Sequence, residues 1–135
     1  MTLRIAIVCG GGFSSSAMAH RVQMDAEKNG LTDRGNFRYI PSHELIKRQD
    51  EADIAMLCPH LVYQMDRFIP NLHIPLYIIP PKLYGTMPAE DMLEDAEDMY
   101  ALWEQTHTNP VQFADEPQPL IIKRHSSHRR APHRG

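Results

Sequence analysis

The fold is decided by a short stretch near the N-terminus, residues 5–12, which reads IAIVCGGG. An apolar run of this length, rich in β-branched residues, is typical of a strand buried on both faces, and the glycines predict that it ends at a loop. Helical spacing follows at Met18, Val22 and Ala26, and Gly30 suits the left-handed end of a helix. A buried strand, a loop and a helix are the opening units of an α/β fold.

The next 75 residues or so repeat this alternation of strand and helix. Further strands are predicted at residues 37–40, 54–57 and 76–79. Helices are predicted after an N-cap at Ser42, between Pro59 and Pro70, and from Pro88 onward. The pattern predicts a three-layer, doubly wound α/β fold, in which a four-stranded parallel sheet of order 2-1-3-4 carries helices on both faces. Ligands bind such sheets where the strand order reverses, which here lies between Cys9 and Cys58.

Composition and charge exclude several classes of function. The chain has 135 residues, 42% of them hydrophobic, and a net charge of −3 that combines an acidic body with a basic C-terminal tail. An acidic body argues against nucleic-acid binding, because phosphate contacts need a concentrated basic surface. The apolar runs are shorter than a membrane span of about 18 residues or a signal-peptide core of about 7–15. We therefore expect a cytoplasmic protein that does not span a membrane.

The two cysteines, Cys9 and Cys58, have different surroundings in the sequence. They could pair, but the cytosol keeps thiols reduced and no export signal is present, so we expect both to be free. Cys58 is interpreted as a small apolar side chain in the core. Cys9 stands at the tip of a strand, directly before the glycines, and this position favours a functional role.

The loop after Cys9 predicts a site for a phosphoryl group. Its backbone N–H groups and the following helix can converge on an anion, and they would lower the pKa of the Cys9 thiol from about 8.5. The candidate cradle consists of Gly10, Gly11, Gly12, Phe13, Ser14, Ser15 and Ser16. The serine hydroxyls add possible hydrogen bonds to phosphoryl oxygens. A buried structural cysteine before an ordinary glycine-rich turn is the alternative.

Other motifs fit this loop less well. A Walker loop needs a lysine that is absent, a dinucleotide motif needs glycine where Ser15 stands, and a nucleophile elbow needs glycine where Ser16 stands. Cysteine phosphatases use C-x-x-x-x-x-R, in which the arginine clamps the phosphate. Ser15 occupies that arginine position. A phosphatase or an enzyme similar to arsenate reductase therefore remains an alternative that lacks its clamping charge.

Three segments carry a resemblance to a known family. Residues 9–16, CGGGFSSS, resemble the C-x-x-G-M-S-T-S phosphocysteine loop of lactose/cellobiose-type IIB components of the bacterial sugar phosphotransferase system. Residues 59–63, PHLVY, are similar to the family's P-Q-x-x-Y, and residues 84–87, YGTM, match its Y-G-x-M. The resemblance covers about residues 3–105. His60 replaces the family's usual glutamine, and Cys58 replaces its usual glycine.

The resemblance implies a fold similar to low-molecular-weight tyrosine phosphatases and the activity of a protein-Npi-phosphohistidine–sugar phosphotransferase. In that activity Cys9 accepts a phosphoryl group from a histidine of the IIA component. It then passes the group to a sugar held by the membrane component IIC, with a β-linked disaccharide such as cellobiose or chitobiose favoured. No cofactor, metal or nucleic acid is implied, and the chain is expected to be monomeric between encounters and peripheral to the inner membrane face through IIC. A degenerate, regulatory IIB-like binding module is a further alternative.

Four residues outside the loop are candidates to support the site or contact a partner. They are Pro59, His60, Tyr63 and Tyr84. A histidine beside a phosphocysteine can donate a hydrogen bond, since its unperturbed pKa of about 6.5 keeps it partly charged near neutral pH. The alternative is that His60 is a polar residue at a helix start that faces the IIA partner. For both tyrosines, the alternative is a core aromatic ring whose hydroxyl reaches the surface.

The sequence divides at about residue 105. Residues 1–105 form the predicted IIB-like domain, and residues 106–135 form a tail rich in histidine, arginine and proline that is expected to be disordered. Metal capture by His125, His128 and His133 and attraction to anionic lipid are the alternatives for the tail. The last predicted helix has an acidic face that we expect to meet water, formed by Glu90, Asp91, Glu94, Asp95 and Asp98.

Overall fold

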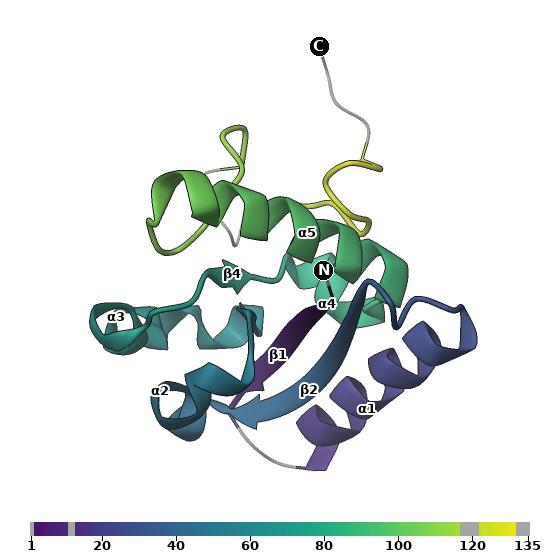
Figure 1. Cartoon of the computed structure of the whole chain (residues 1–135), viewed down its shortest axis with the longest axis horizontal. Helices are drawn as coiled ribbons and strands as arrows, with labels where there is room; N and C mark the ends of the chain where they lie inside the picture. The colour runs from purple at the N-terminus through teal and green to yellow at the C-terminus, as the bar shows by residue number, and fades with distance from the viewer. Residues whose placement is uncertain (1, 11–12, 117–121, 132–135) are drawn as a thin grey trace.

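The computed structural model describes residues 2–10, 13–116 and 122–131 and contains a four-stranded parallel sheet with helices on both faces (Figure 1). The strands are β1 (Leu3–Cys9), β2 (Gly35–Pro41), β3 (Ile54–Leu57) and β4 (Leu76–Ile78). Their order in the sheet is β2-β1-β3-β4. The predicted fold class and strand order are confirmed.

The pairing of β1 with β3 sets the position of the two cysteines. Val8 lies opposite Leu57 in the parallel register. One residue further on, the backbone N–H of Cys58 donates to the carbonyl of Val8 at 3.0 Å. The ladder therefore continues past the last formal strand residue, and it places Cys58 beside Cys9 at the carboxyl edge of the sheet.

The two long helices, α1 (Phe13–Lys28) and α5 (Ala89–Thr106), cover the same face of the sheet. Gly30 follows α1 with φ of 68°, the left-handed conformation predicted from its position. The shorter helical segments are η1 (Ser42–Glu44), α2 (Leu45–Arg48), η2 (Gln49–Glu51), η3 (Pro59–Gln64), α3 (Met65–Phe68), η4 (Ile69–Asn71) and α4 (Pro81–Thr86). The predicted capping role of Ser42 is wrong, since Ser42 is a buried residue inside η1 and Pro41 precedes that segment.

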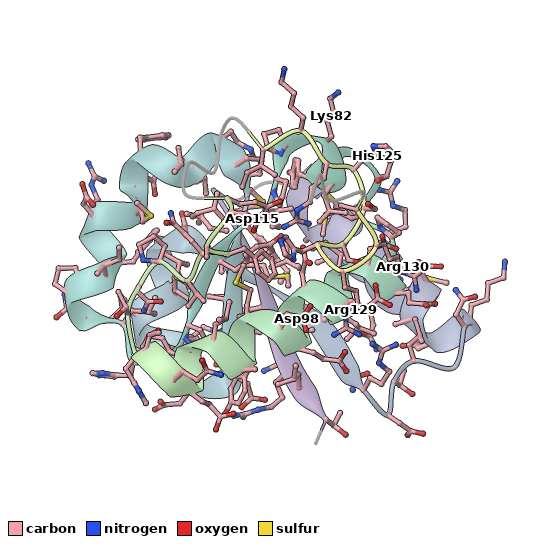
Figure 2. The ribbon with its side chains drawn as sticks, turned by 90° about the horizontal axis from the view of Figure 1, so that it is seen from above. Lys82, Asp98, Asp115, His125, Arg129 and Arg130 are labelled. Carbon is pink, nitrogen blue, oxygen red and sulfur yellow. A yellow bond between two sulfur atoms is a disulfide. The ribbon has the colours of Figure 1, made fainter. Side chains whose placement is uncertain are left out.

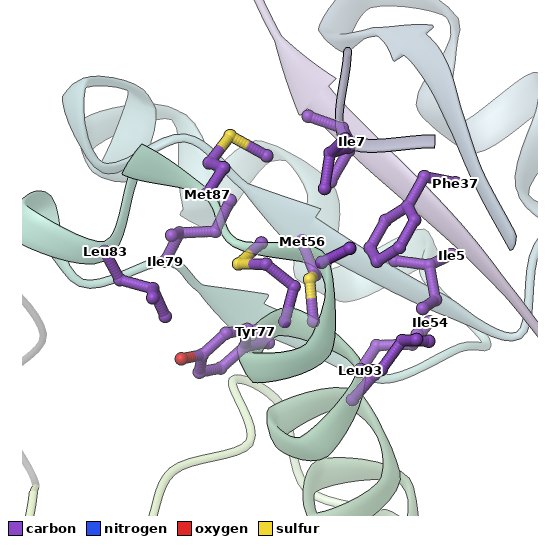
Figure 3. Packing of buried hydrophobic residues seen from close by; sticks show 14 of the residues in the cluster. Ile5, Ile7, Phe37, Ile54, Met56, Tyr77, Ile79, Leu83, Met87 and Leu93 are labelled. Atoms are coloured by element: carbon purple, nitrogen blue, oxygen red, sulfur yellow. The ribbon is translucent and has the colours of Figure 1, made fainter. Parts of the chain in front are cut away.

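Alternation along the strands divides the core into two clusters. Side chains on one face of the sheet, such as Ile5, Ile7 and Met56 (Figure 3), belong to the cluster that α1 and α5 cover. Side chains on the opposite face, such as Val8 and Leu57, pack with α2 and α3. Side chains of successive strand residues point to opposite faces, so the nearly continuous apolar strands serve both layers. Cys9 and Cys58 belong to the cluster that α1 and α5 cover.

The acidic face of α5 is partly buried, so the prediction that it meets water is wrong for two of its carboxylates. Glu94 is 6% exposed and Asp95 is fully buried. The guanidinium of Arg124 donates to Asp95 at 2.7 Å and to Glu116 at 2.8 Å. Burial raises the pKa of the Asp95 carboxyl, and the Arg124 charge opposes that rise. The tail supplies the cation that the buried carboxylate needs.

Residues 122–131 continue along α5 through further ion pairs (Figure 2). Arg129 pairs with Asp98 at 2.8 Å, and Arg130 pairs with Glu90 and Glu94. The ring of His128 stacks on Phe113, with 3.7 Å between ring centroids. The structure thus differs from the expected disorder for this segment, because its arginines meet the carboxylates of α5. His133 lies outside the described residues, and the division at residue 105 stays a prediction.

Replacing Arg124 is expected to destabilise the fold strongly. Arg124→Ala leaves Asp95 buried without its cation, which costs about 3–5 kcal/mol of unfolding free energy. The exposed neighbour provides the control, and Lys123→Ala should change stability by less than about 0.5 kcal/mol. Urea denaturation of both variants measures the two effects, and equal stabilities would show that the tail does not support the fold.

Glu94 makes part of the stability depend on pH. The hydrogen bond from Arg130 lowers the pKa of the Glu94 carboxyl to about 2, against an unfolded value of about 4.3. A carboxyl whose pKa is lower in the folded chain stabilises the fold at pH values above its unfolded pKa. This stabilisation is lost as the pH falls through the folded pKa. Glu94→Gln should therefore cost about 2–3 kcal/mol at neutral pH.

The measurement is the difference in unfolding free energy between the original chain and Glu94→Gln across the acid range. This difference should shrink as the pH falls from about 5 toward about 2. Glu104→Gln, at an exposed position near the end of α5, is the matched control. A difference that stays constant with pH contradicts the stabilisation of the Glu94 carboxylate by Arg130.

Candidate functional site

Cys9 is the last residue of β1, and the chain turns directly from it toward α1. Gly10 is an exposed bend residue, and α1 begins at Phe13. Gly11 and Gly12 lie outside the described residues, as do the side chains of Phe13, Ser14 and Ser15. Ser16 is exposed in the first turn of α1. The described part of the loop thus has the strand–turn–helix context that an anion site of this kind requires.

The expectation of two free thiols is wrong, because Cys9 and Cys58 form a disulfide. Their Cα atoms are 5.5 Å apart, a usual separation for disulfide-bonded residues. Both residues are fully buried. Reduced thiols were expected because the cytosol keeps cysteines reduced. The parallel register of β1 and β3 instead brings the two residues to bonding distance.

Tyr84 and His60 lie next to the cysteines. Tyr84 belongs to α4, and its hydroxyl is 3.9 Å from Sγ of Cys9. A disulfide sulfur carries no hydrogen, so in this weak contact the tyrosine is the donor. Burial raises the pKa of the Tyr84 hydroxyl, which keeps its proton in place at neutral pH. The His60 ring meets the Tyr84 ring edge to face, with 5.7 Å between centroids.

The other two candidates, Pro59 and Tyr63, sit differently. Pro59 is buried at the first position of η3, directly after Cys58. Tyr63 is 73% exposed, and its hydroxyl accepts a hydrogen bond from the Gln64 amide at 3.1 Å. The structure therefore links Cys9 to Tyr84 and Tyr84 to His60, and it leaves Tyr63 on the surface of η3.

Two features of this site were not predicted from the sequence. One is the bond between the cysteines, although their predicted place at the switch of strand order already brought them together. The other is α4, which carries Tyr84 to the sulfur. Pro80 and Pro81, directly after a strand, were the available signal, because proline suits the first turn of a helix. Met87 then ends α4 in the left-handed conformation, with φ of 42°.

A hollow of about 520 Å³ lies at the opposite edge of the sheet, near the amino ends of β1 and β2. Its walls include Arg4, which is paired with Asp53, and Arg38, which is paired with Glu51. Both of these charges thus have partners within the chain. In the described part of the chain, no three His, Cys, Asp or Glu side chains gather as metal ligands, and no helix is long and apolar enough to cross a bilayer.

Comparison with known proteins agrees with the fold. The family model of the PTS system, Lactose/Cellobiose specific IIB subunit, matches residues 4–95. The solution structure of cellobiose-specific phosphotransferase IIB component protein from Borrelia burgdorferi is similar, with a TM-score of 0.53 and 24% identity. The alignment covers 75% of this chain and 94% of that chain, and at this identity it concerns the fold alone. No curated protein matches the chain.

Proposed function

We propose that Cys9 carries the phosphoryl group in this chain, which belongs to the lactose/cellobiose-specific IIB subunit family of the sugar phosphotransferase system. Membership makes the chain a phosphoryl-carrier subunit with a general phosphotransferase role. The observation that supports Cys9 is its position at the carboxyl end of β1, beside β3 and before α1. Ligands of doubly wound sheets bind at this point.

The proposed relay has two displacement steps at phosphorus. The Cys9 thiolate attacks the phosphoryl group of a IIA phosphohistidine, so that a P–S bond forms and the P–N bond breaks. A sugar hydroxyl held by IIC then attacks the same phosphorus, and the P–S bond breaks to release the Cys9 thiolate. The hydroxyl proton leaves to a base on the acceptor side. Both steps need the sulfur of Cys9 free, so the relay operates in the reduced form of the chain.

Groups around Cys9 have distinct proposed roles. The backbone N–H groups of residues 10–16 and the hydroxyls of Ser14, Ser15 and Ser16 hold the phosphoryl oxygens. The 16-residue helix α1 adds the partial positive charge of its N-terminus. The Tyr84 hydroxyl, 3.9 Å from the sulfur, donates a hydrogen bond to the thiolate. His60 supports Tyr84 through the contact of their rings.

The proposed partners follow from the family. The donor is a IIA component, the acceptor is a sugar bound by IIC, and the activity is that of a protein-Npi-phosphohistidine–sugar phosphotransferase. The motif at residues 84–87 favours a β-linked disaccharide such as cellobiose or chitobiose. We place the chain in the cytoplasm, as a monomer that meets the inner membrane face through IIC. The exposed residues His60 and Tyr63, on the segment that follows Cys58, are proposed to contact these partners.

Removing the Cys9 sulfur is expected to abolish labelling. With phosphorylated IIA of the lactose/cellobiose type in reducing buffer, Cys9→Ser should take up no phosphoryl group, because the nucleophile is lost. Cys58→Ser should keep most of the labelling, since Cys58 has no part in either displacement. Radiolabel transfer measures the labelling rate of each variant. Equal losses of labelling in the two variants would contradict the assignment of Cys9.

The relay and the phosphatase alternative differ in what happens to the phosphocysteine. A phosphatase stabilises attack by water with a clamping arginine, and the loss of such a charge costs about two to three powers of ten in rate. Ser15 stands at that position. The phosphothiol ester should therefore persist after IIA is removed, and aryl phosphates should hardly be hydrolysed. Steady aryl-phosphate turnover that vanishes in Cys9→Ser would favour the hydrolase instead.

A further inference from the structure

The sulfur of Cys9 is bonded to Cys58, and the proposed relay cannot use it in that state. A disulfide sulfur is not a thiolate, so it cannot attack phosphorus. One sulfur atom cannot hold a phosphoryl group and a disulfide together. The bonded state and the phosphorylated state therefore exclude each other.

We propose that Cys9 and Cys58 form a thiol–disulfide exchange site that switches the relay off when oxidised and on when reduced by a dithiol. The effect on phosphoryl transfer rests on the proposed function of Cys9, whereas the exchange itself does not. Disulfides in cytosolic proteins are usually transient and serve catalysis or redox sensing. Cys58 thus has a task of its own, as the residue that captures the Cys9 sulfur.

The sheet itself holds the two cysteines at bonding distance. The Cys58 N–H donates to Val8 at 3.0 Å on one side of β3, and the Ile79 N–H donates to Leu57 at 3.0 Å on the other. With hydrogen bonds on both edges, β3 presents Cys58 in a set position, and the Cα atoms lie 5.5 Å apart. Groups held in this way react with a high effective concentration. An internal disulfide should therefore form in preference to one with an external thiol.

The two sulfurs have different surroundings, which gives the exchange a direction. Sγ of Cys9 has the Tyr84 hydroxyl at 3.9 Å and lies before the N-terminus of α1. Cys58 lies in the same apolar cluster as Cys9 but is followed by the buried Pro59, whereas the hydroxyl contact of Tyr84 is to Cys9. A better-stabilised thiolate is the better leaving group in thiol–disulfide exchange. Reduction should release Cys9 first, as the thiolate that the relay needs.

The exchange balances with a dithiol as the reductant. One thiolate of the dithiol attacks Sγ of Cys58, the S–S bond breaks, and Cys9 leaves as a thiolate. The second thiolate of the dithiol attacks the mixed disulfide at the dithiol's own sulfur, and Cys58 leaves and takes up a proton. Two electrons have passed from the dithiol to the cysteine pair. Oxidation by a small disulfide such as oxidised glutathione runs the same steps in reverse.

The first experiment measures the exchange without any phosphoryl donor. The full chain is equilibrated in glutathione buffers of graded ratio, its free thiols are alkylated, and its intact mass is recorded. The original chain should pass from two alkylated thiols to none, without a glutathione adduct. Cys58→Ala and Cys9→Ser should instead each keep one thiol, or gain one glutathione at more oxidising ratios. An original chain that keeps both thiols, or that carries glutathione instead, overturns the exchange site.

The second experiment measures labelling by phosphorylated IIA across the same buffers. The original chain should lose labelling as its internal disulfide forms, and dithiothreitol should restore it. Cys58→Ala should label normally when reduced, and its loss of labelling should need an oxidised-to-reduced ratio more than about tenfold higher. Thermal melts of both chains provide the folding control. Loss of labelling at the same ratio in both chains would overturn the role of Cys58.

Failure of the two proposals can be told apart. A reduced original chain that takes up no phosphoryl group, yet converts from two thiols to none, would overturn the relay at Cys9 and support the exchange site. A chain that labels equally in reduced and oxidised buffers would overturn the switch. If mass analysis finds two free thiols in both buffers, the relay at Cys9 still stands. If it finds the disulfide in the oxidised buffer, the relay at Cys9 is overturned as well. Phosphorylated chain should also resist oxidised glutathione, because its Cys9 sulfur is already occupied.

Discussion

The parallel pairing of β1 with β3 is the constraint on which the rest of the site depends. Parallel strands end at the same edge of the sheet, so the pairing of Val8 with Leu57 sets Cys9 beside Cys58. From the neighbouring β4, α4 brings the Tyr84 hydroxyl to 3.9 Å from Sγ of Cys9, and η3, which follows Cys58, carries His60 to the ring of Tyr84. A single register thus places Cys9, the proposed nucleophile, beside Cys58 and close to the Tyr84 hydroxyl. On our proposal, the same register also supplies the second cysteine, which captures the Cys9 sulfur.

A second organising interaction joins α5 to β4 and to the basic tail. Isolated carboxylates are costly to bury, and Asp95 is tolerated because Arg124 and the hydroxyl of Tyr77 bind it. The matched family region ends at residue 95, whereas α5 continues to Thr106 and residues 122–131 return along it. In this chain the family fold is therefore extended by a basic segment that neutralises an acidic helix.

Much of the fold was predictable because apolar periodicity reports burial directly. The strands at β1 and β3, the sheet order and the helix that holds Val22 all follow from such local patterns. Burial of Asp95 was not predictable, since it depends on a cation at residue 124 that only the tertiary structure brings near. The disulfide was considered and rejected for a different reason. Strand order already placed Cys58 beside Cys9, but an argument from the cellular compartment was given more weight than this geometry.

The central claim is that Cys9, and no other side chain, holds the phosphoryl group. Peptide mapping by mass spectrometry, on reduced chain that has been exposed to phosphorylated IIA and kept at neutral pH, locates the group directly. The account predicts one phosphoryl group on the peptide that contains Cys9, with fragment ions that place it on the sulfur. A phosphoryl group on His60 or Cys58, or none on the reduced chain, would contradict it.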